Sequence, residues 1–368
     1  MAVSPIPMLQ LTRKKSEKAT VGLEIEAGSV AAAEVRVNGS SELTATAIAP
    51  LPSGAFDDGE VVDSDAVAAT LRATFSENGL SKRVRLGIAN QRVVVRTMRL
   101  PAIDDPIELD AAVRFEAEER IPMPIDQAVL DHRVVGGVAA TEDEAPKIDV
   151  VVVAARRDMI AASLKPIRDA GLEPVGVDLS AFGLIRALGG RDVSTNLGSE
   201  APTPPATALY CNIGDATNLA VAKGRSCLFT RVAPAGLEGI ATGLADSSGL
   251  AQEHARLWLA HVGLAQPLET IEGDASLIAQ VREALERGAS TLLDEMRLSL
   301  DFYGAQEGAF PVERVVLSGP GSAIPGLAEQ MAPVLGLPIE LGQPQALAGL
   351  DTAAAARLTL SYGLALEE

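Results

Sequence analysis

The amino-acid sequence predicts an α/β protein built from two similar lobes, and three observations lead to this prediction. Short apolar runs typical of strands alternate with segments of helical periodicity along most of the 368 residues. An apolar run, a small-residue turn and a second apolar run occur at residues 21–35 and again at residues 208–224. A Gly-, Ser- and Pro-rich stretch, residues 189–207, separates the two copies. A motif duplicated across a linker indicates two lobes of the same architecture.

The first lobe is expected over residues 20–188, after a basic, flexible head at residues 1–19. Its opening hairpin, residues 21–35, turns at Gly28-Ser29. A helix follows with Ser64 as its expected N-cap and with Asn78-Gly79 at its end. Strands are then expected near residues 84–89 and 93–100.

The middle of the chain contains a well-delimited helix between two strand regions. Asp105 is its expected cap, Pro106 suits its first turn, and Ile121-Pro122 ends it. Strands follow at residues 128–135 and 148–154, on either side of an acidic loop at residues 141–146. A helix over residues 158–170, a short strand at 175–177 and a helix to residue 188 complete the lobe.

The second lobe is expected over residues 208–350 and is mostly helical after its hairpin. Helices are predicted at residues 236–246, 251–262 and 275–303, and a strand at residues 314–317. The strand leads into the glycine-rich segment SGPGSAIPGL, residues 318–327, and a further helix. A C-terminal helix, within residues 351–368, is expected to pack back between the lobes.

Composition excludes several classes of function. The formal net charge is −18 (31 Lys+Arg against 49 Asp+Glu) and aromatic residues are 3%, which argues against phosphate-tracking and base-stacking surfaces, so we expect no nucleic-acid partner. Cys211 and Cys227 do not form a disulfide framework or a zinc-ligand cluster with the three histidines, so we expect free thiols and no metal site. We find neither a signal-peptide pattern at residues 1–11 nor a run of about 20 apolar residues, so we expect a soluble, cytoplasmic chain.

Four segments in this order resemble the PilM family of type IV pilus assembly proteins, within the actin-like ATPase superfamily. The first is the hairpin VGLEIEAGSVAAAEV at residues 21–35, and the second is residues 93–135, with an R-x-x-x-LP pattern, an EAE-containing helix and the sequence IPMP. The third is residues 154–182, and the fourth is the second hairpin with CNIGDATNLAV. The resemblance covers nearly the whole chain beyond the basic head.

The resemblance implies a two-lobed actin-like (ribonuclease H-like, duplicated) fold with a small α+β subdomain inserted at about residues 100–171. It implies a cytoplasmic scaffold, peripheral at the inner face of the cytoplasmic membrane, that docks the N-terminal tail of the inner-membrane protein PilN. The family links this alignment complex to the pilus motor, so pilus motor ATPases and the platform protein are implied partners. The alternative is an active actin-like ATPase whose lobes close on ATP; a sugar or acetate kinase of the superfamily would also need an acceptor pocket.

The resemblance further implies a nucleotide between the lobes, with both hairpins around its phosphates and a glycine-rich loop at its adenosine. Several positions depart from this pattern: Glu26 replaces a glycine, Asn212 replaces an aspartate, and Ala31 and Trp258 stand where relatives carry lysine. These changes predict weak or absent hydrolysis and leave open whether ATP or ADP with magnesium, or nothing, binds. The implied nucleotide residues are Glu24, Glu26, Ser29, Asn212, Gly214, Asp215, Thr217, Gly319, Gly321 and Ser322.

By the same resemblance, the partner tail lies in a groove between the inserted subdomain and the first lobe. An acidic groove would suit a tail that carries Lys or Arg. Each candidate also has a simpler interpretation, since the prolines can end a helix and the glutamates can form a solvated helix face. The candidate partner-binding residues are Arg99, Pro101, Glu116, Glu118, Pro122, Pro124 and Asp131.

Overall fold

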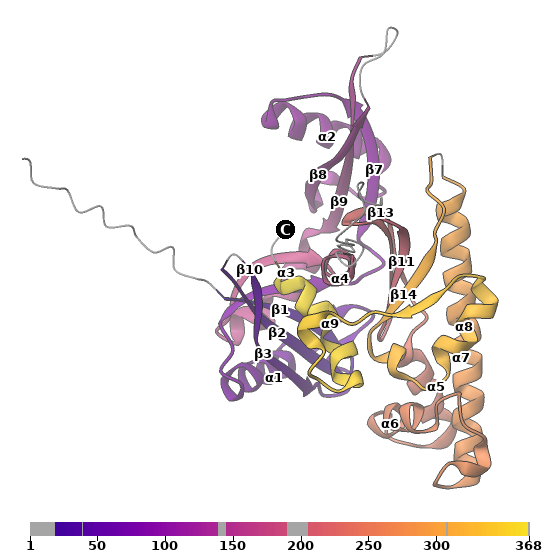
Figure 1. Ribbon diagram of the computed structural model, residues 1–368. Coiled ribbons are helices and arrows are strands. Elements are labelled where there is room, and N and C mark those ends of the chain that lie inside the picture. Colours follow the sequence, from indigo (N-terminus) through magenta and orange to yellow (C-terminus); the bar gives the residue numbers. More distant parts are fainter. Residues whose placement is uncertain (1–18, 39, 139–144, 190–204, 307, 367–368) are drawn as a thin grey trace, which may run out of the picture.

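The computed structural model describes residues 19–38, 40–138, 145–189, 205–306 and 308–366. Most of the expected basic head and of the expected linker, and residues 141–144 of the acidic loop, lie outside these ranges. Figure 1 shows two sheet-based lobes side by side, and a smaller unit that carries helix α2 projects from them.

Each lobe has a five-stranded sheet at its centre, and the two sheets have the same strand order. In each, the first two strands form an antiparallel hairpin, a third strand extends it, and two later strands pair in parallel on the other side. This confirms the duplication predicted from the two hairpin motifs. The first sheet contains β10 (Glu173–Leu179), β6 (Arg83–Ile88), β1 (Thr20–Glu26), β2 (Ser29–Val37) and β3 (Ser41–Pro50). The second contains β15 (Ile339–Leu341), β14 (Arg314–Ser318), β11 (Thr207–Ile213), β12 (Thr217–Lys223) and β13 (Ser226–Ala233).

Three of these strands, β3, β13 and β15, are missing from the sequence-based prediction. Each is the outer strand of its sheet. An outer strand is only half buried, so its sequence lacks the apolar run by which we recognised the inner strands. A small hairpin of β4 (Phe56–Asp57) and β5 (Glu60–Val61) turns at Asp58 and Gly59, which both have positive φ.

Helices cover one face of each sheet. In the first lobe, α1 (Ser64–Glu77) and α3 (Arg157–Asp169) pack on the face that carries Val21, Leu23 and Ile25 of β1. In the second lobe, α5 (Leu237–Ser248), α6 (Gln252–Val262), α7 (Ala275–Gly304) and α8 (Leu327–Leu335) belong to the larger core around Leu209 and Cys211 of β11. Cys211 and Cys227 are free thiols.

The cap of α1 differs from the prediction by one residue. Asp63, instead of Ser64, is the N-cap, because its carboxylate accepts the N–H groups of Asp65 and Ala66, each at 3.0 Å. Either residue type is a good cap, so the sequence pattern alone does not separate two adjacent candidates. The cap predicted for α2 (Pro106–Arg120), Asp105, is confirmed by its bonds to Ile107 and Glu108.

The opposite faces of the two sheets are covered by exchanged helices. Helix α4 (Ser180–Leu188), which the sequence placed in the first lobe, packs on the second sheet against Tyr210 and Val316. Helix α9 (Thr352–Ala365) packs on the first sheet against Ala31 and Ala33 of β2. Each sheet is thus covered by a helix that follows the other lobe in the sequence (Figure 1).

The exchanged helices meet at a glycine pair. A Cβ on Gly363 of α9 would lie 1.9 Å from the carbonyl oxygen of Gly183 on α4, so only glycine permits this approach. Arg186 of α4 donates from Nε to the carbonyl oxygen of Gly363 (3.0 Å) and pairs with Asp178. Arg85 of β6 donates to the carbonyl oxygen of Leu364, in the last turn of α9, and to that of Leu366, just after the helix.

The small unit is a three-stranded antiparallel sheet with a helix on one face. Its strands run in the order β7 (Val94–Pro101), β9 (Lys147–Arg156), β8 (Ala128–Val138), and α2 packs through Val113 and Ala117 against Met98, Val150 and Val152. The unit therefore spans residues 94–156. The expected bounds of about 100–171 are shifted, because β7 pairs with β9 while α3 packs in the first-lobe core.

Candidate functional site

The turns of the two long hairpins face each other between the lobes and are joined by reciprocal hydrogen bonds. The N–H of Ala27, in the β1–β2 turn, donates to the carboxylate of Asp215, in the β11–β12 turn. In return, the N–H of Asp215 donates to Oε1 of Glu26 at 3.3 Å. Gly214 permits this contact, because a Cβ there would lie 1.8 Å from Oε1 of Glu26. The two hairpin turns thus bring Glu26 and Asp215 together between the lobes.

A cation from the C-terminal helix completes this site. Arg357 of α9, 7% exposed, contacts Glu24 Oε2 at 3.1 Å and Glu26 Oε2 at 2.7 Å through Nη1. Its Nε and Nη2 donate to Oγ of Ser29 at 3.1 and 2.8 Å. We call Glu24, Glu26, Ser29, Asp215 and Arg357 the interlobe clasp.

Sequence reasoning missed Arg357. It identified the negative charge of Glu26 and looked for a countercharge at Ala31, which is instead buried against α9. The available signal was a single arginine within the otherwise small and apolar segment of residues 353–365. A buried charge requires a partner, so a lone arginine on a buried helix predicts a carboxylate opposite it.

Burial changes the protonation of the clasp carboxyls. The pKa of Glu24 is raised to about 8, mainly by burial and then by the negative charge of Glu26, against the opposing effect of Arg357. Burial, followed by the charge of Glu26, likewise raises the pKa of Asp215 to about 8. These two carboxyls therefore hold their protons more tightly than usual, which reduces the negative charge that faces Arg357.

Among the other implied nucleotide residues of the second hairpin, Thr217 and Gly214 serve local structure. Thr217 donates through Oγ1 to the carbonyl oxygen of Ala235 at 2.6 Å, and the carbonyl oxygen of Gly214 accepts the N–H of Leu237 at 2.8 Å. Asn212 lies beside Ser318 on the neighbouring strand, and both are buried. The side-chain Nδ2 of Asn212 and Oγ of Ser318 have no hydrogen-bond partner among the described residues.

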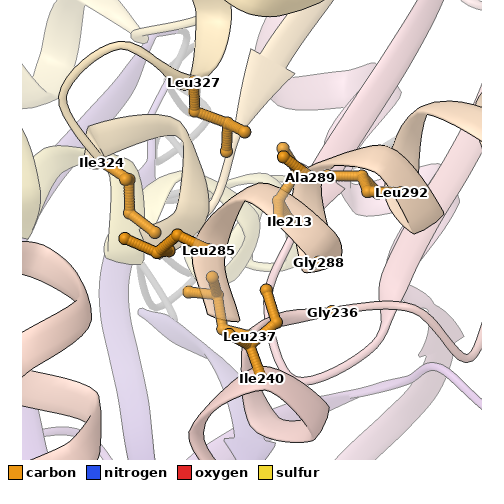
Figure 2. A pocket seen from close by; sticks show the side chains of 10 residues that line it. All are labelled: Ile213, Gly236, Leu237, Ile240, Leu285, Gly288, Ala289, Leu292, Ile324 and Leu327. Atoms are coloured by element: carbon orange, nitrogen blue, oxygen red, sulfur yellow. The ribbon is translucent and has the colours of Figure 1, made fainter. Parts of the chain in front are cut away.

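The glycine-rich loop packs directly on the end of β11. Gly319 has φ 78°, and a Cβ on Gly321 would lie 2.3 Å from Cγ2 of Ile213. Ser322 bonds back to the carbonyl oxygen of Gly319 through its N–H and its hydroxyl. Beside this loop, the apolar side chains in Figure 2, among them Ile324 and Leu285, enclose a cavity of only ≈ 10 Å³. That volume is about the space that one water molecule needs.

These residues do not fit a magnesium nucleotide. A phosphate site between two hairpin turns needs free backbone N–H donors. Here the N–H of Ala27 and that of Asp215 are already bonded to the acidic side chains of Asp215 and Glu26, which take the place of phosphate oxygens. Arg357 is already paired with Glu24 and Glu26. The structure therefore brings most of the implied phosphate-binding residues together but uses them to bind one another.

A second site is a groove of ≈ 790 Å³ to which the small unit and both lobes contribute. One wall is the face of the small sheet opposite α2, because Val151, Val153 and Ala155 of β9 line the groove while the alternating residues Val150 and Val152 pack on α2. The facing walls are the end of β10 with α4, and residues 225–227 at the start of β13. Both β8 and β10 are outer strands of their sheets, so their free edges lie along the groove.

Asp131 is the candidate partner residue that lines this groove. Arg99 pairs with Asp149 at 2.7 Å on the same face of the small sheet, and Pro101 lies at the end of β7. Pro122 and Pro124 lie in the turn after α2. Their participation in partner binding stays a prediction.

The acidic helix lies on the other side of the small sheet. Glu116 pairs with Arg120 on α2, and Glu118 is exposed on the same helix. Because α2 covers the face opposite the groove, its carboxylates do not line the groove, and the expected acidic character is absent from the lining. The lining contains the acids Asp131 and Asp178 together with three arginines, Arg133, Arg186 and Arg225.

Comparison with known proteins decides the family. The family model described as type IV pilus assembly protein PilM matches residues 22–367. The chain belongs to the PilM family. A solved structure titled as the PilM-PilN type IV pilus biogenesis complex is 28% identical, with coverage of 94% of this chain and 97% of that one, at a TM-score of 0.77. The predicted membership in the PilM family is confirmed.

More distant structures share the fold of this PilM family member. The ethanolamine utilization protein EutJ from Carboxydothermus hydrogenoformans is 14% identical over 99% of this chain and 91% of its own, with a TM-score of 0.53. MreB 5 of Spiroplasma citri, bound to AMPPNP, is 12% identical over 94% of both chains, with a TM-score of 0.51. Together with the PilM-PilN structure, they confirm the predicted two-lobed actin-like fold.

Proposed function

We propose that this chain is a docking subunit of type IV pilus assembly that binds the cytoplasmic tail of a PilN-like membrane protein in the ≈ 790 Å³ groove. The observation that carries the proposal is the groove itself, open between the small unit and both lobes. Membership in the PilM family supports the role, and the similar structure titled as a PilM-PilN complex supports the partner.

The chemistry of the groove favours an extended, largely apolar segment. Val129 and Val135 of β8 are each 38% exposed, and they lie beside Val151 and Val153. An extended peptide can pair its backbone with a free strand edge and place alternate side chains on such a surface. The mixture of acidic and basic residues in the lining gives no net preference for a strongly basic tail.

The tail can be tested by titrating the purified protein with the N-terminal peptide of the PilN-like protein. Val129→Asp places a charge on the apolar wall and should weaken binding by about tenfold or more, which corresponds to about 1.4 kcal/mol. Ile107→Asp is the matched control, because Ile107 is 80% exposed on α2, on the far side of the small sheet. Absence of binding by the unmodified protein, or equal loss in both variants, would refute this site.

We also propose that ATP hydrolysis is weak or absent. The support is the interlobe clasp, in which the turn N–H donors already have carboxylate partners. Turnover of Mg·ATP by the purified protein should equal the background rate and should not change in Glu24→Ala. Turnover that depends on Glu24 would instead establish the alternative, an actin-like ATPase.

From family membership alone, we propose that the protein links its PilN-like partner to the pilus motor ATPases and the platform protein. No helix among the described residues is long and apolar enough to cross a membrane. We propose that the protein lies at the inner face of the cytoplasmic membrane by binding its partner's tail. Fractionation of cells with and without the PilN-like protein tests this, and membrane association that persists without that protein would contradict it.

A further inference from the structure

The interlobe clasp and the groove lie at different places in the same two-lobed body. The two hairpin turns are joined by the bonds of Asp215 to Ala27 and Glu26, and Arg357 holds Glu26 from the side of the first lobe. The groove is lined from the first lobe by residues 177–179 of β10 and from the second lobe by residues 225–227. Its shape therefore depends on how the two lobes are held relative to each other.

Arg357 has the bonding of a fixed structural cation. Its guanidinium contacts Glu24, Glu26 and Ser29 through all three nitrogens, including the carbonyl oxygen of Ser29 at 3.3 Å. Arginine presents its donors in a rigid planar fork, so this arrangement restrains the turn geometrically as well as electrostatically. Because α9 carries Arg357 and also packs on β2, the restraint extends into the first-lobe core.

The second lobe is tied to the same turn by further contacts. Arg256 of α6 lies against the turn, since a Cβ on Gly28 would be 2.8 Å from its guanidinium carbon. Arg256 in turn pairs with Glu238 of α5 at 2.7 Å. A Cβ on Gly236 would lie 2.1 Å from the carbonyl oxygen of Asp215, so the second turn is packed against the chain that leads into α5.

We propose that the interlobe clasp takes the place of a bound nucleotide in this protein: it holds the lobes closed without any ligand and thereby keeps the partner groove permanently formed. The part that concerns the groove rests on the proposed function. A protein whose binding-competent state is fully populated binds its partner at its intrinsic affinity. If the clasp is loosened, the apparent affinity falls in proportion to the fraction of molecules that stay competent.

The first test uses the unmodified protein and needs no variant. Calorimetric titration with Mg·ATP and with Mg·ADP at millimolar nucleotide should give no heat of binding. Small-angle scattering with and without either nucleotide should give the same radius of gyration. Micromolar binding of either nucleotide, or a change in radius, would overturn the inference while leaving the docking function intact.

The second test measures the tail affinity of Arg357→Gln and Glu26→Gln, which weaken the clasp without touching the groove. If loosening leaves about one tenth of the molecules competent, the dissociation constant rises about tenfold. Arg231→Gln is the matched control, because Arg231 pairs with Glu295 at 2.6 Å entirely within the second lobe. Unchanged affinity in folded clasp variants would overturn the coupling.

The outcomes separate the two proposals. If the unmodified protein binds no tail peptide, the docking function fails, and the nucleotide titration and scattering still decide the clasp. If Arg357→Gln does not fold, Glu26→Gln provides the affinity comparison, since it keeps a hydrogen-bonding side chain of the same size.

Discussion

Arg357 is a buried cation on a helix whose other residues are mostly small or apolar, and its partners are separated from it in the chain by more than 300 residues. Taking a charge out of water is costly unless close partners compensate it. Three carboxyls surround this one guanidinium, so at least part of the negative charge must be neutralised by protonation. The site is therefore sensitive to pH as well as to mutation.

The raised pKa values predict that stability falls as pH rises. A carboxyl that binds its proton more tightly in the folded state stabilises the fold at any pH below its pKa in the unfolded chain. This stabilisation is lost as the pH rises through its pKa in the folded state, which is about 8. We expect the free energy of unfolding to decrease between about pH 5 and pH 8, by at most about 1.4 kcal/mol per pH unit for each proton. Denaturant titrations at several pH values measure it.

The control for this prediction removes one titrating group. Glu24→Gln should flatten the dependence, while Glu26, Arg357 and Glu238 continue to face Asp215. Asp110 and Asp158 do not contribute between pH 5 and pH 8, because Arg114 and Arg156 lower their pKa values and they titrate in more acidic solution. Stability that rises from pH 5 to pH 8 would contradict the assignment of raised pKa values to the clasp.

At this scale, the sequence pointed to four of the five clasp residues. The family resemblance implied Glu24, Glu26, Ser29 and Asp215, as residues around the phosphates of a nucleotide. It did not predict that their carboxylates would bond to the opposite turn, because that depends on the distance between the lobes. It also did not predict Arg357, whose contact with β1 is set by the packing of α9.

Among the elements, the helices were predicted best because they carry end signals in the sequence. Asp105 before Pro106 and the glycines after α1 and α3 delimit them locally. The exchange of α4 and α9 has no such signal, because each helix has apolar residues that could pack on either sheet. Which helix covers which sheet is decided by the three-dimensional arrangement of the lobes.

The crossing of α4 and α9 predicts a large effect of one methyl group. Gly363→Ala would place Cβ 1.9 Å from the carbonyl oxygen of Gly183, so the helices must separate. We expect a loss of about 1–3 kcal/mol or more in the free energy of unfolding, as for other overpacked sites. Chemical denaturation monitored by circular dichroism measures the change.

The matched control is the same substitution in an open helix position. Gly243 lies within α5, and a Cβ there would have no atom within 4 Å. Gly243→Ala should therefore stabilise the protein by about 0.5–1 kcal/mol through helix propensity. Equal effects of the two substitutions would show that the glycine contact between α4 and α9 is not tight in solution.

For the whole molecule, the exchange of helices predicts that the lobes unfold together. Neither sheet keeps both faces covered if the other lobe loses its structure, because α4 and α9 belong to cores shared between them. Native-state hydrogen exchange of amides in β1 and β11 should report the same opening free energy, within about 1 kcal/mol. Clearly different values would show that the lobes are independent folding units.

The covering of the first sheet by α9 also has a consequence for how the chain is made. Residues 352–365 follow every other described element, so they leave the ribosome after all of them. Until then, the face of β2 that carries Ala31, Ala33 and Val35 has no cover, and such uncovered apolar surface favours aggregation. The nascent protein should therefore depend on chaperone protection until residues 352–365 have emerged, and premature termination shortly before residue 352 should give an insoluble product.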